Sequence, residues 1–332
     1  MEDFFKVKDD ELSKGRVTLR DLMKSRGWTN AKYSMTDESC IIANRPDGKE
    51  VRLCYGTPPT MSYGAGRVAD DKYVTYCLLQ DLDSVKQPQT ILLRTNKTPE
   101  VELEKQLKKL LVSHSEIVIK PFDGAHGLDV FVGIKDLDSA KSALRTIKEH
   151  AWTGLVLAQE MLHVDQPEVR VICIDYKFVA AYARIPAHVT GDGEHTVLEL
   201  IDIENSTIRT APYQSNLSYI NRSAALDYLE KQNPSLENYI PKSGEKVQVV
   251  GVCNTGQGGT MEDITAAFPE HLRRQAEDIV KKMQLPLGGV DYMGDYVIEV
   301  NKAPALYHPV AGPASIICVQ KFVEYLEKIK LD

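Results

Sequence analysis

The sequence predicts a mixed α/β protein of the α+β class. Amphipathic helical segments alternate irregularly with short β-rich runs, and tight-turn residues join several of these runs into antiparallel hairpins. Strict alternation of strand and helix, which would indicate a parallel sheet, is absent. The chain has 332 residues, 43% hydrophobic and 26% charged, so it contains ample material for a buried core. This length predicts two or three domains, or one domain with lobes.

The first elements are predicted to be a short helix and a hairpin. The dipeptide Asp47-Gly48 lies between two β-rich runs and is typical of a tight hairpin turn. In chain order, the pattern predicts a helix at residues 16–27, a hairpin at 40–56, a boundary rich in Gly and Pro at 56–66 and a helix at 70–82.

Residues 98–112 have a clear helical pattern. Thr98 is placed to cap the helix, Pro99 suits its first position, and leucines recur along one face. The following elements are predicted to be a strand at 116–122, a turn at 123–127, a strand at 128–134, a helix that Asp138 opens and a buried strand at 154–162.

The second half of the chain is predicted to be rich in hairpins. Residues 195–240 are mixed and partly helical. The other predicted elements are a hairpin of 169–175 and 178–187 around Tyr176-Lys177, a strand at 246–252, a flexible loop at 254–260, an amphipathic helix at 269–284 and a hairpin at 290–301.

The last hairpin carries a chemical signal. Glu299 and Asn301 are two residues apart, so they share one face of a strand. Residues that pair across an antiparallel hairpin have a constant index sum, and Asp291 joins that face only if the sum is even. A two-residue turn at Gly294-Asp295 gives an odd sum and separates the carboxylates. We therefore predict a loop of odd length, or an equivalent bulge.

Two carboxylates and an amide oxygen on one face suit Mg²⁺. This hard cation prefers oxygen ligands and keeps waters or phosphate oxygens in its other positions. The spacing is equally compatible with a solvated strand face that holds no metal. The hairpin alone therefore leaves both a magnesium site and a plain polar surface open.

Lys120 ends an apolar strand just before the glycine-rich turn at 123–127. A lysine there either reaches solvent at the rim or binds phosphate, and glycines let backbone N–H groups approach a phosphate closely. Taken alone, the turn is explained as an ordinary tight hairpin. The chain has no Walker A sequence, and no G-x-G-x-x-G after a strand supports a standard dinucleotide site.

Three further segments offer polar groups without a decisive spacing. Residues 159–162 leave a strand and offer backbone groups to an adenine edge. Glu168 follows and could accept hydrogen bonds from ribose hydroxyls. A plain connection between lobes explains this segment more simply. Arg170 and Arg184 lie on facing strands and fit phosphate or carboxylate oxygens, although exposed sheet arginines are common. The loop at 254–260 offers many N–H groups to an anion, or is a surface loop.

Composition argues against several classes of function. The net charge is −7, so we expect no general basic surface for nucleic acid. No apolar stretch is long enough to span a membrane, and the charged N-terminus is no signal peptide. The six cysteines form no C-x-x-C pair, and several lie in apolar runs. This pattern indicates reduced, buried thiols in a cytoplasmic protein.

In their order along the chain, these signals resemble the ATP-grasp superfamily of carboxylate–amine ligases. More narrowly, the chain is similar to the ATP-grasp region of cyanophycin synthetase and of the bifunctional glutathione synthases. The similarity covers about residues 62–325, and residues 1–60 show no convincing match. The stretches that carry it are DDKYVTYCLL (70–79), VIKPFDGAHG (118–127), RIPAHVTGDGEHTVLELIDIEN (184–205), NTGQGGTMEDIT (254–265) and GGVDYMGDYVIEVNKAP (288–304).

The resemblance implies an ATP-grasp fold, in which two α+β lobes sandwich ATP. The expected boundaries are 1–66 for a small N-terminal α/β region, 67–163 for lobe A and 164–332 for lobe B. The resemblance also implies an ATP-dependent ligase that forms an amide bond through an acyl phosphate. Its cofactors would be ATP and two Mg²⁺ ions, or Mn²⁺. Its substrates would be amino acids or small peptides, and a homodimer is expected by analogy.

The family pattern implies roles for individual residues. The metal ligands would be Asp291, Glu299 and Asn301, and the catalytic residues Arg184, Lys120 and Asn301. Nucleotide contacts would come from Lys72, Lys120, Gly124, His126, Gly127, Gln159, Glu160, Leu162, Glu168 and Arg184. Substrate contacts would come from Arg170, His188, Asn254, Gly258, Gly259 and Thr260.

The chain also departs from the family pattern. Tyr76 follows Thr75 where a second lysine is common, Leu128-Asp129 replaces Arg-Gly, and Ala305 replaces a glycine. Four alternatives therefore stay open beside the amino-acid ligase: a degenerate ATP-binding regulatory module, a ligase that modifies a ribosomal precursor peptide, an acid–thiol ligase and a kinase.

Overall fold

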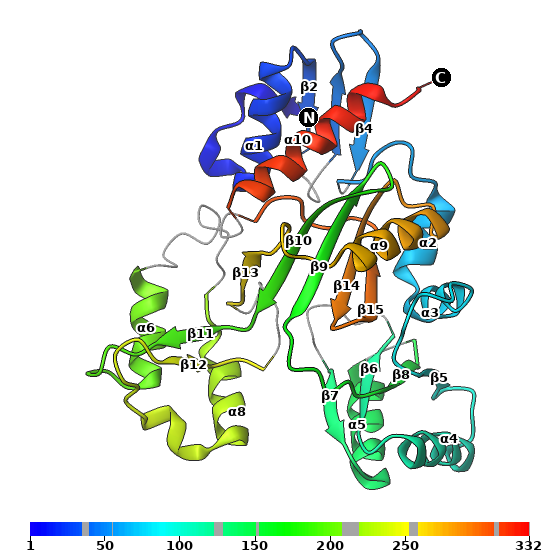
Figure 1. Ribbon diagram of the computed structural model, residues 1–332, viewed down its shortest axis with the longest axis vertical. Coiled ribbons are helices and arrows are strands. Elements are labelled where there is room, and N and C mark those ends of the chain that lie inside the picture. The colour runs from blue at the N-terminus through cyan, green and yellow to red at the C-terminus, as the bar shows by residue number, and fades with distance from the viewer. Residues whose placement is uncertain are drawn as a thin grey trace.

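A computed structural model describes residues 1–34, 40–54, 56–122, 129–150, 153–207, 219–251, 258–308 and 312–331. These residues form four β-sheets with helices packed around them (Figure 1). Every strand pair within these sheets is antiparallel. The predicted α+β class is therefore confirmed.

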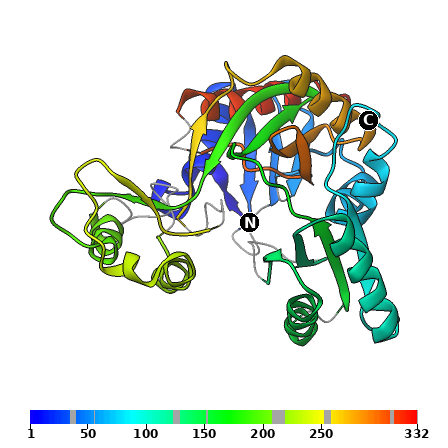
Figure 2. The same cartoon turned by 60° about the horizontal axis from the view of Figure 1, so that its bottom comes forward.

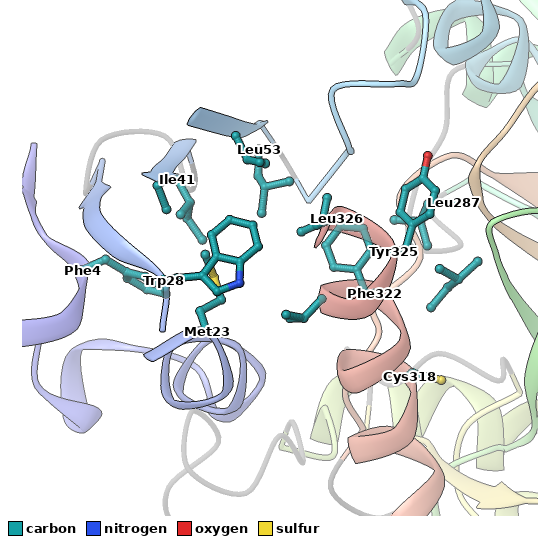
Figure 3. Close-up of a cluster of buried hydrophobic side chains, with 14 of the residues drawn as sticks. Phe4, Met23, Trp28, Ile41, Leu53, Leu287, Cys318, Phe322, Tyr325 and Leu326 are labelled. Carbon is teal, nitrogen blue, oxygen red and sulfur yellow. The ribbon is translucent and has the colours of Figure 1, made fainter. Parts of the chain in front are cut away.

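The two ends of the chain build one unit. Its sheet contains β1 (Glu2–Asp3), β2 (Thr29–Tyr33), β3 (Cys40–Asn44) and β4 (Glu50–Cys54), and its helices are α1 (Lys14–Ser25), α10 (Pro313–Lys328) and the short 3₁₀ helices η1 (Phe4–Lys6) and η2 (Asp9–Glu11). Arg45 Nη1 donates to the carbonyls of Leu326 and Ile329, at 3.1 and 2.8 Å. In Figure 3, Ile41 and Leu53 from the sheet lie opposite α10.

A second sheet, in the order β5-β8-β6-β7, forms a separate lobe. Its elements are β5 (Thr90–Arg94), β6 (Ile117–Pro121), β7 (Phe131–Ile134), β8 (Leu155–Glu160), α4 (Glu100–Ser113) and α5 (Leu137–His150). The leucine face of α4 and the apolar face of α5 share a core with the sheet. This burial leaves the opposite face of the sheet available for polar groups.

The central sheet has the order β13-β10-β9-β14-β15. Its strands are β9 (Glu168–Ile174), β10 (Lys177–Ile185), β13 (Thr260–Asp263), β14 (Leu287–Met293) and β15 (Tyr296–Asn301). One face packs on α9 (Glu270–Lys282) with α2 (Tyr63–Asp70) and α3 (Lys72–Leu79). The other face shares a core with α10 and the N-terminal sheet.

A small unit extends from one side of the central sheet. It contains β11 (His188–Thr190), β12 (Lys246–Gln248), α6 (Val197–Thr207), α8 (Arg222–Gln232) and η3 (Pro234–Asn238). It has its own apolar core. Figure 2 shows this unit and the β5–β8 lobe on opposite sides of the central sheet.

Most predicted elements are confirmed, including the hairpins at 40–56 and 290–301 and the helices at 98–112 and 269–284. Several elements had not been predicted from the sequence, among them β2, α2, β5, β13 and α10. Four details were wrong. The helix expected to be capped by Thr98 has Pro99 at its N-cap, and α5 begins at Leu137, one residue before Asp138. Asp175 and Tyr176, rather than Tyr176-Lys177, form the turn between β9 and β10, and both have positive φ. The predicted boundary at 56–66 overlaps α2, which starts at Tyr63.

The cysteine prediction is only partly confirmed. Cys173 and Cys318 are buried, as expected. Cys54 and Cys77 are exposed, and Cys40 is half-buried with its sulfur 2.9 Å from that of Cys54. Alternation explains the difference, because Cys40 and Cys54 pair on the outer face of their sheet while Ile41 and Leu53 face the core.

Candidate active site

The β14–β15 hairpin contains the bulge that its chemistry requires. Met293 pairs with Tyr296 around a two-residue turn, so the predicted odd-length loop is wrong. The register then shifts, and Asp291 pairs directly with Glu299. Ile298 is the extra residue that restores the even sum. The alternative prediction, an equivalent bulge, is therefore confirmed.

The bulge brings the three oxygen-bearing residues onto one face. Asn301 pairs with Gly289, two residues before Asp291 on the same strand, so Asn301 also lies on the face of Asp291 and Glu299. Asn301 Nδ2 donates to Asp291 Oδ2 at 3.3 Å. Among the described residues, no group of three or more His, Cys, Asp or Glu forms a metal cluster. A metal site here would therefore depend on the amide oxygen of Asn301.

Two arginines surround Asp291. Arg170 on β9 donates through Nε and Nη2 to the two carboxylate oxygens of Asp291, at 2.7 and 2.6 Å. Arg184 on β10 lies 3.6 Å from Asp291 Oδ2 and donates to Glu168. Only 1% of the Asp291 side chain is exposed, compared with 13% of Arg170. The carboxylate is thus buried with two cations beside it.

These contacts set the protonation of the cluster. Burial opposes the charge of Arg170, but the charge and hydrogen bonds of Asp291 outweigh burial and hold the pKa of Arg170 above its ordinary value. Burial raises the pKa of Glu168. The charge of Arg184 opposes this rise, and the charge of Asp291 adds to it. The cluster is therefore a compact arrangement of permanent cations and carboxylates.

Arg184 keeps unused hydrogen-bonding capacity. Its Nε is buried and has no hydrogen-bond partner among the described residues. A buried N–H of a guanidinium without a partner is costly, because it has lost water and gained nothing. An anion placed beside Arg184 would satisfy it, and a phosphate or carboxylate oxygen fits the fork of an arginine.

Two lysines face the same region from other elements. Lys72, the first residue of α3, places Nζ 3.6 Å from Glu299 Oε1. Within the described part of the chain, the side chain of Lys120 on β6 makes no hydrogen bond or ion pair. Burial and the nearby charge of Lys72 lower the pKa of Lys120 to about 8. A half-buried ammonium with a lowered pKa is a good candidate for binding a polyanion.

A cavity between the central sheet and the β5–β8 sheet connects these groups. Lys72, Lys120 and Glu299 line it, together with Gln159 of β8. Gln159 Nε2 donates to Thr90 Oγ1 at 2.8 Å, which fixes the amide at the cavity wall. The remaining lining residues include Thr75, Tyr76, Gln87, Pro88 and Leu157.

Other site residues predicted from the sequence lie elsewhere. The Glu160 carboxylate accepts from the backbone N–H of Gln89 at 3.1 Å and lies 3.6 Å from His114 Nδ1, so its side chain is engaged outside the cavity. Leu162 is half-buried in the connection between the sheets. His188 begins β11 in the small unit, where it contacts Pro186 O at 3.2 Å.

The two predicted loops are only partly described. Gly124, His126, Gly127 and Asn254 lie outside the described residues. Gly258 and Gly259 are buried, and Thr260 begins β13. A Cβ on Gly258 would lie 2.8 Å from Ile220 Cγ1, and its φ is +95°, so this position requires glycine. The glycine is therefore explained by close packing against the small unit.

Some residues of the site gave no sequence signal. Thr90 and Gln87 lie on or before β5, which the pattern did not predict. His308 lies near Arg170 and Arg184, and burial with these charges lowers its pKa to about 4. Its ring packs edge-on against Tyr182 at 5.7 Å. A single histidine after a proline-containing segment has no diagnostic spacing, so only the fold reveals it.

Comparison with solved structures identifies the fold. The chain has the ATP-grasp fold: its structure aligns with a bifunctional glutathione synthetase from Pasteurella multocida over 96% of this chain and 44% of that chain, with a TM-score of 0.63 and 20% identity. A D-alanine–D-alanine ligase from Bacillus anthracis aligns over 80% of this chain and 69% of that chain, with a TM-score of 0.50 and 16% identity. At these identities, the alignments establish the fold alone.

Sequence comparisons place homologues in two groups of ligases. Residues 91–195 match the model of the prokaryotic glutathione synthetase ATP-grasp domain. Cyanophycin synthetase from Crocosphaera subtropica is 33% identical over 209 residues, which cover 59% of this chain and 24% of the relative. A bifunctional glutathione biosynthesis protein from Listeria monocytogenes is 27% identical over 221 residues, covering 59% and 27%. The chain thus spans about a quarter of the length of these curated relatives.

The chain therefore has the ATP-grasp fold and is similar over part of its length to cyanophycin synthetases and bifunctional glutathione biosynthesis proteins. Within the described residues, no helix is both long and apolar enough to cross a membrane.

Proposed function

We propose that this protein is an ATP-dependent carboxylate–amine ligase that forms an amide bond on an amino acid or small peptide. The observation that carries the proposal is the alignment of Asp291, Glu299 and Asn301 on one sheet face, beside Arg184 and opposite Lys120. The homologous ligases support the same reaction class. A bond-forming role needs both phosphate-binding cations and metal-binding oxygens, and this junction offers both.

The donor set fits a hard divalent cation. Two carboxylates and an amide oxygen would hold Mg²⁺, and Mn²⁺ would accept the same ligands. We propose two ions, both bound with ATP. When bound, they would neutralise phosphate charge and orient the transferred phosphoryl group. The oxygens of Asp291 already accept from Arg170, so Asp291 would have to share its carboxylate between the arginine and a metal ion.

The chain's own cations would position the nucleotide. Lys72 and Lys120 line the cavity and would contact phosphate oxygens, and phosphate binding would restore the charge that burial disfavours on Lys120. Arg184 would direct its unpaired Nε at the transferred phosphoryl group. Gln159 and Leu162 would contact adenine, and Glu168 would accept from ribose hydroxyls. The turn that contains Gly124, His126 and Gly127 would cover the phosphates.

The reaction needs activation of the carboxylate, because oxide is a poor leaving group. The substrate carboxylate attacks the γ-phosphorus of ATP, which gives an acyl phosphate and ADP. An amine then attacks the acyl carbon, and phosphate leaves. Positioning and charge neutralisation supply most of the catalysis. Arg170 and the segment 254–260, with Gly258, Gly259 and Thr260, would hold the substrate carboxylate and exclude water, because the acyl phosphate hydrolyses.

A phosphate-release screen tests this proposal. The purified chain is incubated with ATP, Mg²⁺ and pairs of amino acids or γ-glutamyl peptides, and phosphate and ADP are measured. A ligase releases both only when an acid is present, and Glu299→Ala abolishes the release. ATP binding without any acid-dependent turnover would instead support the regulatory module. Consumption of coenzyme A would support an acid–thiol ligase.

Three finer points are part of the proposal. We propose a homodimer by analogy with related ligases, and size-exclusion chromatography with light scattering measures it. We propose the cytoplasm as the location, because the cysteines show no disulfide spacing. A precursor-peptide ligase is the same chemistry with a larger acid substrate, and the screen separates it when only peptides support turnover.

A further inference from the structure

A second cavity lies between the two ends of the chain, apart from the nucleotide cavity. Its floor is apolar and comes from the N-terminal strands and α10. Ile41 of β3, Leu53 of β4 and Phe322 of α10 line it, and Figure 3 shows these three side chains within the buried apolar cluster. Leu12, Leu19, Leu306 and Val319 extend the apolar lining. Such a floor suits a hydrocarbon side chain, because burying it removes apolar surface from water.

The rim of this cavity carries acidic groups. Asp10 and Glu11, from η2, line it and are exposed. The Glu11 carboxylate accepts from the backbone N–H of Lys8 at 3.1 Å, whereas the Asp10 side chain makes no hydrogen bond or ion pair with the described residues. Arg16 also lines the cavity, but its Nη1 donates to Tyr33 OH at 2.7 Å. The rim therefore offers a carboxylate for a ligand ammonium.

The wall of the cavity begins at the proposed metal site. Ala303, Pro304 and Ala305 line the cavity and follow Asn301 in the chain after one intervening residue, Lys302. Pro304 packs over the central sheet, where a Cβ on Gly289 would lie 2.9 Å from Pro304 Cβ. The two Cα steps from Asn301 to Ala303 span at most about 7 Å. The nearest part of the cavity wall therefore lies within about the length of one amino acid of Asn301.

The N-terminal unit is held against this wall by a close contact. A Cβ on Gly15 would lie 3.0 Å from Tyr307 Cβ, so the start of α1 and the wall segment touch directly. Both Gly15 and Tyr307 line the cavity. The cavity is thus built by the two chain ends together.

We propose that this cavity binds the carboxylate-donating substrate, an amino acid or short peptide with an apolar side chain. This inference rests on the proposed ligase function. The side chain occupies the apolar floor, and the ammonium lies at the Asp10 rim. A neighbouring carboxylate stabilises the protonated amine, which keeps it from acting as a nucleophile. The ligand's own carboxylate then extends toward Arg170, Arg184 and the triad.

The activation step balances without any further reactant. A carboxylate oxygen of the bound amino acid forms a bond to the γ-phosphorus, and the bond between that phosphorus and the β,γ-bridging oxygen breaks. The products are an aminoacyl phosphate and ADP. Hydroxylamine, added as the amine, attacks the acyl carbon through nitrogen; phosphate leaves and a proton passes to water. The product is an amino-acid hydroxamate, which reports which acid was activated.

Binding is measured first, without ATP. Isothermal titration calorimetry of the full chain uses L-leucine, L-phenylalanine, glycine and N-acetyl-L-leucine. The four affinities show separately how much the side chain and the ammonium contribute to binding. We expect L-leucine to bind roughly 10- to 200-fold more tightly than glycine, and more tightly than N-acetyl-L-leucine. Equal affinity for glycine and L-leucine would overturn the inference.

Two variants then test the cavity in the hydroxamate assay. Ala305→Phe fills the cavity from an exposed position, and it should raise the KM for L-leucine about tenfold or more while leaving the KM for ATP unchanged. Asp10→Asn removes the rim charge and should raise the KM for L-leucine about threefold to fivefold. The matched controls are Ala267→Phe and Asp83→Asn, exposed residues outside the cavity.

The outcomes separate this inference from the proposed function. Hydroxamates formed equally from all acids, or unaffected by both cavity variants, would overturn the cavity assignment while the ligase proposal stands. L-Leucine binding that Ala305→Phe abolishes, without any ATP-dependent product, would support the cavity and overturn the ligase. Consumption of L-leucine as the amine, with no leucine hydroxamate, would overturn its assignment as the carboxylate donor. Circular dichroism confirms that each variant is folded.

Discussion

One face of the central sheet has two chemically different halves. In the first half, Ile172, Ile174 and Leu287 are buried against α10 and the N-terminal sheet. In the second half, Arg170 and Asp291 occupy the same face of the same strands, two and four residues away. The strands therefore supply one continuous surface, and the covering elements decide its chemistry.

The covering elements change between the two halves. Helix α10 packs on the apolar half, where Tyr182 OH lies 3.3 Å from Cys318 Sγ. Pro304, in the segment after β15, packs over Gly289 near the border. In the charged half, Lys72 at the start of α3 lies 3.6 Å from Glu299, and Asp291 forms an ion pair with Arg170. A buried charged half is harder to stabilise than an apolar one, and this cost is the reason for the ligand site proposed there.

The largest expected effect is on catalysis in the charged half. Replacing Glu299 by Ala removes a proposed metal ligand, so kcat/KM for ATP should fall on the order of 10³-fold. Glu299 is about a third exposed and pairs only loosely with Lys72, at 3.6 Å. Stability should therefore change by less than about 1 kcal/mol. Steady-state kinetics and urea unfolding measure the two effects.

Asp295→Ala is the matched control for Glu299→Ala. Asp295 lies in the turn of the same hairpin and pairs with Lys86 at 3.5 Å, outside the site. Its substitution should leave both activity and stability near those of the unmodified protein. An equal loss of activity in both variants would mean that the hairpin is needed only as a scaffold.

The next effect is on stability in the same half. Asp291→Ala leaves the guanidinium of Arg170 without its bidentate partner, which should lower the free energy of unfolding by roughly 3 to 5 kcal/mol. Urea unfolding monitored by fluorescence measures it. The double variant Asp291→Ala, Arg170→Leu should recover part of this loss, because it also removes the unpaired cation. No recovery would contradict the ion-pair explanation.

The apolar half should respond in the opposite way. Ile172→Ala creates a cavity two residues from Arg170 and should cost about 2 to 4 kcal/mol of stability. The KM for ATP should change by less than about threefold, because Ile172 touches the core and not the site. Stability and KM are measured on the same preparation. A large rise in KM would show that the two halves are not independent.

The smallest expected effect concerns Lys120, whose replacement should raise the stability of the protein instead of lowering it. Its folded pKa is about 8 and the unfolded value is near 10.5, so the unfolded state binds more protons between these pH values. Lys120 therefore destabilises the ligand-free protein below pH 8, and this cost fades as pH rises to 10.5. Lys120→Met should stabilise by roughly 1 to 3 kcal/mol at pH 7 and by less at pH 9.5.

Urea unfolding at pH 7 and pH 9.5 measures the Lys120 effect, and ATP binding is measured beside it. The substitution should weaken ATP binding although it stabilises the fold. A loss of stability at pH 7 would contradict the assignment of Lys120 as a cation held for a ligand.

The sequence predicted the local part of the site well. Alternation placed Glu299 and Asn301 on one face, and parity required a bulge for Asp291 to join them. Both arguments use only neighbouring residues, whose geometry the pleated strand determines. The lysine at the end of β6 was predicted for the same reason.

The sequence could not predict contacts between distant strands. Arg170 and Asp291 are 121 residues apart, and their pairing depends on β9 lying between β10 and β14. The side chain of Glu160 lies outside the cavity that Gln159 lines, because successive residues of a strand alternate faces. Helix α10 returns to the N-terminal sheet, and no local pattern records that contact.

Binding of Mn²⁺, followed by electron paramagnetic resonance with a non-hydrolysable ATP analogue, tests the central claim most directly. The account predicts that the analogue tightens Mn²⁺ binding to the unmodified chain and to Asp295→Ala, and that Glu299→Ala weakens this ternary complex about tenfold or more. Equal Mn²⁺ affinity in Glu299→Ala and the unmodified chain, with the analogue bound in both, would contradict it.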